Sequence, residues 1–316
     1  MNLFRRVIRF LFFLVGLVAG VVVSVAAFMA QRMIRPERQR LWLTPEDLGL
    51  PYEKIHFPAE DGLRLAGWFI PAENSEVQDR ATVVLVHGWP WNRLGEAATD
   101  LVSNLSSASP VDLMRLALAL HREEYNVLMF DLRNHGESAA KPPVMFGLQE
   151  ARDLLGALAY LKDRDDVNAD KVGVVGFSMG ANTLLYTLPY TRDIKAGVAV
   201  QPATPAVFAD GFGQHLLGGL SKVVVPLAEL FYVAAGGIRL DDYRPAAAAA
   251  GAGDTPILFV QGEGDSWGSV ADVAGMAASA PAGGEALVVS SKHRFDGYQH
   301  VLDHPDMVTE FFDKNL

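Results

Sequence analysis

The longest apolar run of the chain lies near its start. Residues 10–30 make up 21 positions without a charged side chain. As a helix rising about 1.5 Å per residue, such a run is about 30 Å long, which matches the hydrocarbon core of a bilayer. Arginines flank the run on both sides. The pattern predicts a membrane-anchoring helix within residues 1–40, followed by a separate domain over residues 41–316.

A cleaved signal peptide is the competing interpretation of this segment. Apolar cores of signal peptides usually have about 7–15 residues, fewer than the run here. Residues 24–26, Ser-Val-Ala, nevertheless fit a small-x-small cleavage site. We expect a retained single-pass membrane anchor. The flanking arginines nearly balance, so the orientation stays open. A chain that begins near Arg40 is expected to be soluble and active.

Beyond residue 50, short apolar runs alternate with helical patterns. Two alternating segments around Asp61-Gly62 predict an antiparallel hairpin. Apolar strands that alternate with helices predict an α/β fold with a mostly parallel sheet and helices on both faces. The expected strands are residues 81–86, 126–130, 171–175, 196–200, 256–260 and 286–289, and the expected helices are residues 111–121, 149–161, 181–188, 270–280 and 306–314.

Residues 201–253 break the alternation, because they are too long for a simple strand-to-helix connection. Within them, residues 215–238 are strongly apolar but are interrupted by Lys222, Pro226 and Glu229. We therefore expect a helical cap inserted at about residues 201–253 rather than a second membrane span. An apolar cap suggests an acyl or lipid-like ligand, although it also fits a peptidase.

Composition and charge exclude several kinds of site. The chain has no cysteine, which rules out disulfides, thiolate metal sites and cysteine nucleophiles. Residues 1–40 carry seven arginines and one acidic residue, whereas the whole chain has a net charge of −10. The acidic body argues against nucleic acid as a partner, and the basic start suits anionic lipid head groups. No metal-ligand spacing or phosphate loop is present, so we expect no cofactor and no metal.

A nucleophile motif joins the expected strand at 171–175 to a helix-forming run. It reads Gly176-Phe177-Ser178-Met179-Gly180. In this strand-to-helix context, G-x-S-x-G is a sharp turn that exposes the serine above the sheet. Glycines two positions on either side relieve crowding there, and the N–H of Met179 at the helix start is suited to stabilise an oxyanion. The motif predicts Ser178 as a nucleophile; the alternative is a Gly-rich turn with a solvated serine.

These features resemble the α/β-hydrolase superfamily, in particular its bacterial branch of BEM46-like and serine-aminopeptidase-like enzymes. Besides the serine motif, the resemblance is carried by residues 61–68, 83–88 and 131–138, which read DGLRLAGW, VVLVHG and DLRNHGES. It covers about residues 50–316. It implies the α/β-hydrolase fold and identifies the superfamily much better than the substrate.

The acid and the base follow the serine in the chain order Ser, Asp/Glu, His. Residues 256–265 resemble the family's strand-G-x-x-D element, which delivers the acid, and here the acid is Asp265. Glu263 and Asp272 are the alternatives. His293 follows the last expected strand and is the predicted base, with His300 as the alternative. The loop before His293 reads Ser-Ser-Lys, where the family usually has glycines.

The remaining polar residues of these motifs receive supporting roles. The second oxyanion donor is expected to be the N–H of Trp89, which follows His87-Gly88. His87, His135 and Asp131 precede the nucleophile in the chain and are expected to fix their own turns. The sequence thus predicts a serine hydrolase that cleaves acyl esters, amides or thioesters of small-molecule substrates through an acyl-enzyme. A membrane-anchored scaffold that has lost the chemistry is the alternative. The oligomeric state stays open.

Overall fold

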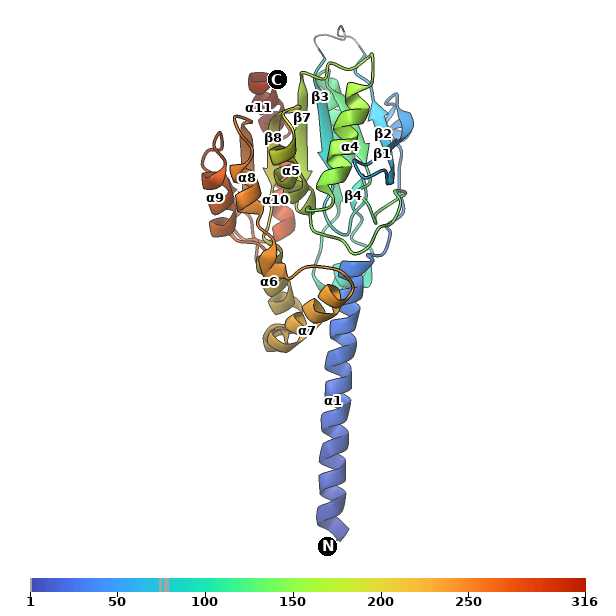
Figure 1. Ribbon diagram of the computed structural model, residues 1–316, viewed down its shortest axis with the longest axis vertical. Helices are drawn as coiled ribbons and strands as arrows, with labels where there is room; N and C mark the ends of the chain where they lie inside the picture. The colour runs from blue at the N-terminus through green and yellow to red at the C-terminus, as the bar shows by residue number, and fades with distance from the viewer. Residues whose placement is uncertain (1, 74–75, 77–79) are drawn as a thin grey trace.

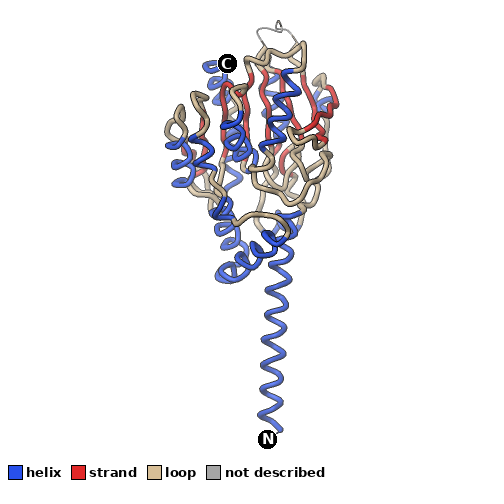
Figure 2. Tube along the Cα trace, viewed as in Figure 1, coloured by secondary structure: helices blue, strands red, loops and turns tan. Residues whose placement is uncertain are grey.

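The computed structural model describes residues 2–73, 76 and 80–316. Helix α1 (Asn2–Ile34) extends from the body of the protein as a long stalk (Figure 1). The body is a single mixed sheet with helices on both faces (Figure 2). The expected α/β architecture, with an N-terminal hairpin and a mostly parallel sheet, is confirmed.

The main sheet has eight strands in the order β1-β2-β6-β3-β7-β8-β9-β10. Strand β2 pairs antiparallel with β1 on one side and with β6 on the other. All other neighbouring strands of this sheet pair parallel. The strands are β1 (Glu53–Pro58), β2 (Arg64–Ile70), β3 (Thr82–Val86), β6 (Asn126–Phe130), β7 (Val172–Phe177), β8 (Ile194–Val200), β9 (Ile257–Gly262) and β10 (Leu287–Val289). Strands β4 (Gly95–Glu96) and β5 (Val111–Asp112) form a separate small pair.

The helices divide between the two faces of the sheet. Apolar side chains of α4, α5, α8 and α9 pack in one core cluster, and those of α3, α10 and α11 pack in the other. Every position of β3 and β6 is buried, as expected for strands covered on both faces. The helices of the body are α2 (Leu101–Leu105), α3 (Leu113–Arg122), α4 (Ala151–Lys162), α5 (Met179–Thr187), α6 (Pro205–Leu217), α7 (Ser221–Ala234), α8 (Pro245–Ala250), α9 (Val270–Ser279), α10 (Arg294–Asp303) and α11 (Asp306–Asn315).

Residues 201–253, between β8 and β9, contain α6, α7 and α8. Residues 205–234 have a mean hydropathy of 1.6 and satisfy the length and composition test for a membrane span. The turn Gly218–Leu220 divides them into α6 and α7, so they form two short helices instead of one long one. Both helices lie at the end of the body from which α1 extends (Figure 1).

Helix α1 has two different halves. Its first half exposes large apolar side chains such as Phe12 and Val15, and the span Phe4–Ile34 has a mean hydropathy of 2.7. Its second half packs on α7, where Ala26 and Ala30 are buried against Val224 and Ala228 in a small cluster. Small side chains let two helices approach closely, so the end of α1 is docked on the body. Helix α1 is long and apolar enough for an anchor or a signal sequence.

Candidate active site

The chain makes a strained turn at Ser178, between β7 and α5. Ser178 has φ 52° and ψ −114°, a conformation that non-glycine residues rarely adopt. A β-carbon on Gly176 would lie 2.3 Å from the carbonyl oxygen of Gly180, and one on Gly180 would lie 2.1 Å from that of Val86. The glycines are therefore needed for the close approach that the turn requires. The half-buried Ser178 is left accessible at the carboxyl end of β7.

Two backbone amides predicted as oxyanion donors lie beside this turn. Met179 is the first residue of α5, and the first N–H groups of a helix have no acceptor within the helix. The loop after β3 comes close to the serine, since a β-carbon on Gly88 would lie 3.2 Å from that of Ser178. Trp89 follows Gly88 and lines the same cavity as Ser178. Both amides thus belong to the immediate surroundings of the serine.

Asp265, the predicted acid, is buried at the turn after β9. Its carboxylate accepts hydrogen bonds from the N–H groups of Trp267 and Gly268, both at 3.0 Å, and from the side chain of Gln261 at 3.2 Å. These neutral donors would stabilise the charged form in a buried position.

The two alternative acids have partners of their own. Glu263 is exposed and accepts a hydrogen bond from the Ser290 hydroxyl at 3.0 Å. Asp272 accepts hydrogen bonds from the backbone N–H and the hydroxyl of Thr204, both at 2.8 Å. Neither carboxylate is hydrogen-bonded to Ser178 or to Arg294 in the described part of the chain, whereas Asp265 is linked to Ser178 through Arg294.

The side chain between Asp265 and Ser178 is that of Arg294. Its guanidinium pairs with the carboxylate of Asp265, and its Nη2 donates to Ser178 Oγ at 3.1 Å and to the carbonyl of Gln201 at 3.0 Å. Arg294 is only 2% exposed. Burial disfavours its charge, but the carboxylate of Asp265 outweighs this and raises the pKa of Arg294. A permanently charged guanidinium therefore occupies the space where a base would bind the serine hydroxyl.

His293, the predicted base, lies one residue earlier and points elsewhere. It caps the start of α10: its Nδ1 accepts a hydrogen bond from the N–H of Phe295 at 3.3 Å. The imidazole stacks on Phe295 and meets the edge of Trp267, with ring centroids 5.4 and 5.5 Å apart. Its buried Nε2 has no hydrogen-bond partner among the described residues. The structure thus brings Ser178 and Asp265 to one guanidinium and leaves His293 beside them, unconnected.

His300, the alternative base, lies within α10. Its ring is 4.6 Å from that of His304, centroid to centroid. Between the described residues no hydrogen bond joins it to Ser178 or Asp265. The assignment of the base to His293 or to His300 stays a prediction.

Sequence reasoning missed Arg294, and one signal could have pointed to it. Asp296 accepts hydrogen bonds from the N–H groups of Lys292 and His293, at 2.8 and 3.0 Å, and so completes a capping box with His293. A side chain that caps a helix turns toward the helix's own N–H groups. The spacing His-x-x-Asp therefore indicated that His293 can be held away from the serine.

The polar residues expected to fix their turns are buried beside the serine turn. The Nε2 of His87 accepts a hydrogen bond from the N–H of Leu132 at 3.0 Å, and burial lowers the pKa of His87 to about 4. Asp131 accepts hydrogen bonds from the N–H groups of Arg93 and Glu137 at 2.8 and 2.7 Å. Burial also lowers the pKa of His135, to about 3. These contacts hold the loops after β3 and β6 together.

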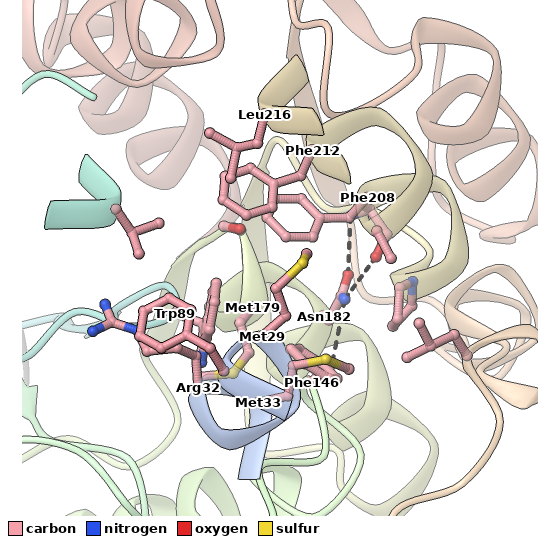
Figure 3. A pocket seen from close by; sticks show the side chains of 17 residues that line it. Met29, Arg32, Met33, Trp89, Phe146, Met179, Asn182, Phe208, Phe212 and Leu216 are labelled. Carbon is pink, nitrogen blue, oxygen red and sulfur yellow. Dashed lines mark hydrogen bonds between the residues drawn. The ribbon is translucent and has the colours of Figure 1, made fainter. Parts of the chain in front are cut away.

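A largely apolar cavity opens beside Ser178 (Figure 3). Its empty space, including the open mouth, is about 880 Å³. Helix α6 contributes Phe208, Phe212 and Leu216 to one side, and helix α1 contributes Met29 and Met33 to the other (Figure 3). The sequence did not indicate that the N-terminal helix reaches the site. The described residues include no group of three or more His, Asp and Glu side chains arranged to hold a metal ion.

Comparisons with known proteins identify the family and support the fold. Residues 83–312 match the Alpha/beta hydrolase family. The protein YfhR of Salmonella typhimurium is 31% identical over 186 residues, which are 57% of this chain and 54% of that protein. The chain thus spans about half the length of the first curated relatives it matches. A Mycobacterium tuberculosis protein is 25% identical over 77% of this chain and 76% of its own length.

Among solved structures, the esterase Pf2001 of Pyrococcus furiosus is similar, with a TM-score of 0.68 and 25% identity. The alignment covers 90% of this chain and 98% of the esterase. An esterase from Exiguobacterium antarcticum has a TM-score of 0.56 at 17% identity, over 83% of this chain and the whole of that one, and at this identity only the fold is comparable.

Proposed function

The chain belongs to the α/β hydrolase family, and we propose that it is a serine hydrolase with Ser178 as its nucleophile. Its fold is the α/β-hydrolase fold, and the similar Pyrococcus furiosus esterase supports hydrolase activity in general. The observation that carries the proposal is the strained turn at Ser178, held by two glycines that no larger residue can replace. Such strain is retained where a function depends on it.

The proposed reaction transfers an acyl group in two steps. Ser178 Oγ attacks the carbonyl carbon of an ester, amide or thioester, and its proton passes to Nε2 of His293. The N–H groups of Trp89 and Met179 stabilise the oxyanion, and His293 protonates the leaving group as its bond to carbon breaks. A water molecule then attacks the acyl-enzyme, which releases the carboxylic acid and returns the proton to Ser178. Asp265 orients the imidazole and stabilises its charged form.

This reaction requires a different side chain between Ser178 and Asp265. An arginine stays protonated at any accessible pH and therefore cannot accept the serine proton. Nε2 of His293 is buried and without a partner among the described residues, and His293 is bonded directly to Arg294 in the chain. We propose that turnover exchanges the two side chains at the start of α10, so that the imidazole takes the place of the guanidinium.

Arg294 also favours a second candidate function. If the guanidinium never leaves, Ser178 has no base, and the chain is a membrane-anchored scaffold with the hydrolase fold. Labelling with a fluorophosphonate probe separates the two, because it requires an activated serine. We expect labelling of the full chain and none of Ser178→Ala. Equal absence of labelling in both, with both proteins folded, would favour the scaffold.

We further propose that α1 is a retained anchor in a bacterial inner membrane. The apolar, outward-facing first half of α1 supports this, and so do the arginines on both sides of it. We expect the full chain to stay in the membrane pellet through a carbonate wash, with Met1 retained. A mature N-terminus near Ala27, measured by mass spectrometry, would instead indicate a cleaved signal.

A further inference from the structure

We propose that the substrate is a lipid of the bilayer, and that helix α1 forms one wall of the site that binds its acyl chain. This inference rests on the proposed hydrolase function and names the substrate class. In it, the N-terminal helix is part of the active site as well as an anchor. The argument comes from the lining of the cavity, from a second cavity that meets it at Ser178, and from the surface around its mouth.

The first cavity has the lining that an acyl chain needs. Apart from Ser178, Arg32 and Asn182, its walls consist of apolar side chains. Met29 and Met33 of α1 face Phe208 and Phe212 of α6 across it (Figure 3). Methionines are flexible and fill irregular apolar space, which suits a chain of variable conformation.

A second, more polar cavity meets the first at Ser178. Both cavities are lined by Ser178, Trp89, Arg32, Val102, Phe208 and Phe212, but the second is also lined by Glu96 and Asp100. The serine therefore lies between an apolar space and a more polar one. An ester of a lipid has the same division, since its acyl chain and its polar head lie on opposite sides of the reacting carbonyl.

Two buried donors at this junction have no hydrogen-bond partner within the described chain. They are Nε of Arg32 and Nε1 of Trp89. Arg32 pairs through its other nitrogens with Asp100 and Glu37, so its position at the mouth is fixed. Buried donors are normally satisfied, and oxygens of an ester and its head group can satisfy these two.

The part of α1 that lines the cavity lies at the end of its apolar run. The uncharged run of α1 covers residues 10–30, and the cavity is lined by α1 residues from Phe28 to Met33. The end of the span and the wall of the cavity are thus the same helical turns. Beside them, Leu220 in the turn before α7 and Val223 and Leu230 of α7 are each more than half exposed. Such a patch next to an anchor is suited to rest in the interface, so that a lipid can enter without crossing water.

The first test measures binding and does not depend on turnover. The full-length Ser178→Ala protein would be placed in phosphatidylcholine vesicles that contain a phospholipid with a photoreactive diazirine at the end of one acyl chain. We expect cross-links at Phe208 or Phe212, which lie beyond the anchor. Met29→Trp should reduce them at least fivefold, because indole fills the cavity, whereas Val18→Trp on the exposed face of α1 should not. Cross-links confined to residues 4–21, or unchanged by Met29→Trp, would overturn the inference.

The second test compares long-chain and short-chain esters in the catalytically intact protein. We expect wild type to prefer a hexadecanoyl over a butanoyl ester, and Met29→Trp to lower this ratio of kcat/KM at least tenfold. Phe208→Ala, which widens the same space, should raise the ratio or leave it high. A ratio unchanged in both variants would overturn the inference. Absence of turnover on both esters, together with acyl-chain cross-links in the cavity, would contradict the hydrolase and keep the lipid site.

Discussion

The turn at Ser178 and the start of α10 face each other across the active site, but they are constrained in very different ways. Ser178 is held by hydrogen bonds on both sides, from its own N–H to Val200 and from the N–H of Asn182 to its carbonyl, at 2.9 and 3.1 Å. The start of α10 follows β10, a three-residue edge strand of which only Val289 is buried. The backbone on one side of the site is tightly constrained, and on the other side we propose that the adjacent side chains of His293 and Arg294 alternate in one place.

This difference shows which parts of a site are determined by nearby backbone geometry and which parts depend on distant residues. The turn at Ser178 depends on contacts within residues 176–182 and on the neighbouring strands β3 and β8. The choice between His293 and Arg294 depends on Asp265, Gln201 and Ser178, which are distant in the chain. Each prediction below tests one side of this comparison, beginning with the largest expected effect.

Ser178→Ala should remove nearly all turnover and leave the fold intact. The members of a triad act as a unit, and loss of one usually costs several powers of ten in kcat. The substitution also removes no packing contact of the hydrophobic core, because Ser178 is only half-buried. Measured kcat on a butanoyl ester checks this, with circular dichroism as the control for folding. A variant that keeps more than about a tenth of the wild-type kcat would contradict the nucleophile.

His293→Ala should abolish fluorophosphonate labelling, while His300→Ala should only weaken it. His293 adjoins the side chain that already reaches Ser178, whereas His300 lies two turns further along α10 beside His304. Loss of a general base typically costs about 10²–10⁴ in rate. Labelling rates of the two variants, measured side by side at equal protein concentration, provide the comparison. The opposite ranking would move the base to His300.

Gly180→Ala should destabilise the protein by about 3 kcal/mol, as expected when a substitution forces the backbone apart. Its β-carbon would lie 2.1 Å from the carbonyl oxygen of Val86, which cannot yield without distorting β3. Gly275→Ala in α9 is the matched control, because a β-carbon there meets nothing within 4 Å. We expect that control to be neutral or stabilising by up to about 1 kcal/mol. Equal stability of both variants in urea titrations would show that the turn is not constrained as described.

The buried His87 should make the loops beside Ser178 sensitive to acid. Burial lowers its pKa to about 4, against about 6.5 for an exposed histidine. Between pH 6.5 and pH 4, His87 is therefore protonated in the unfolded chain but neutral in the folded chain. The free energy of unfolding consequently falls as the pH drops through this range. Between pH 7 and pH 5 the loss attributable to His87 is about 2 kcal/mol.

His87→Asn is the variant that tests this origin. It should be less stable than wild type at pH 7, because the N–H of Leu132 loses its acceptor, but it should lose about 2 kcal/mol less between pH 7 and pH 5. His56→Asn, at an exposed position, serves as the control. An unchanged pH slope in His87→Asn would assign the acid sensitivity to other groups.

Much of the fold and part of the site could be predicted from the sequence. Apolar runs identified six strands of the main sheet, and two alternating segments around Asp61-Gly62 identified the two strands of the hairpin. The glycines at 176 and 180 identified the serine turn, because few other residues fit there. Three features could not be predicted, since they depend on contacts between distant segments: Arg294 between Ser178 and Asp265, the cavity wall formed by Met29 and Met33, and the packing of Ala26 on α7.

The contact with Met29 and Met33 changes one expectation in particular. A chain that begins near Arg40 would keep Ser178, Asp265 and His293 but would lose one wall of the cavity. It would also expose the face of α7 that Ala26 and Ala30 now cover. Such a chain is therefore expected to aggregate more readily than the sequence alone suggested, and to lose its selectivity for long acyl chains.

Arg294→Gln is the variant with the smallest expected effect. It tests the comparison between the turn at Ser178 and the start of α10 most directly. Removal of the guanidinium frees the oxygen of Ser178 and opens the space beside Asp265 to His293. Asp265 keeps three N–H donors, so its buried charge is not left without partners. We expect fluorophosphonate labelling to become several-fold faster, since the change shifts a conformational equilibrium by about 1 kcal/mol.

The control for Arg294→Gln is Arg115→Gln. Arg115 is a half-exposed arginine that pairs with Asp303 at the other end of α10, at 2.6 Å. Exposed ion pairs contribute little, about 0–1 kcal/mol, so this variant should label at the wild-type rate. If Arg294→Gln instead labels as poorly as Ser178→Ala while it remains folded, the guanidinium assists the serine and does not block it. The start of α10 would then be as constrained as the turn at Ser178, and the two sides of the site would not differ in this respect.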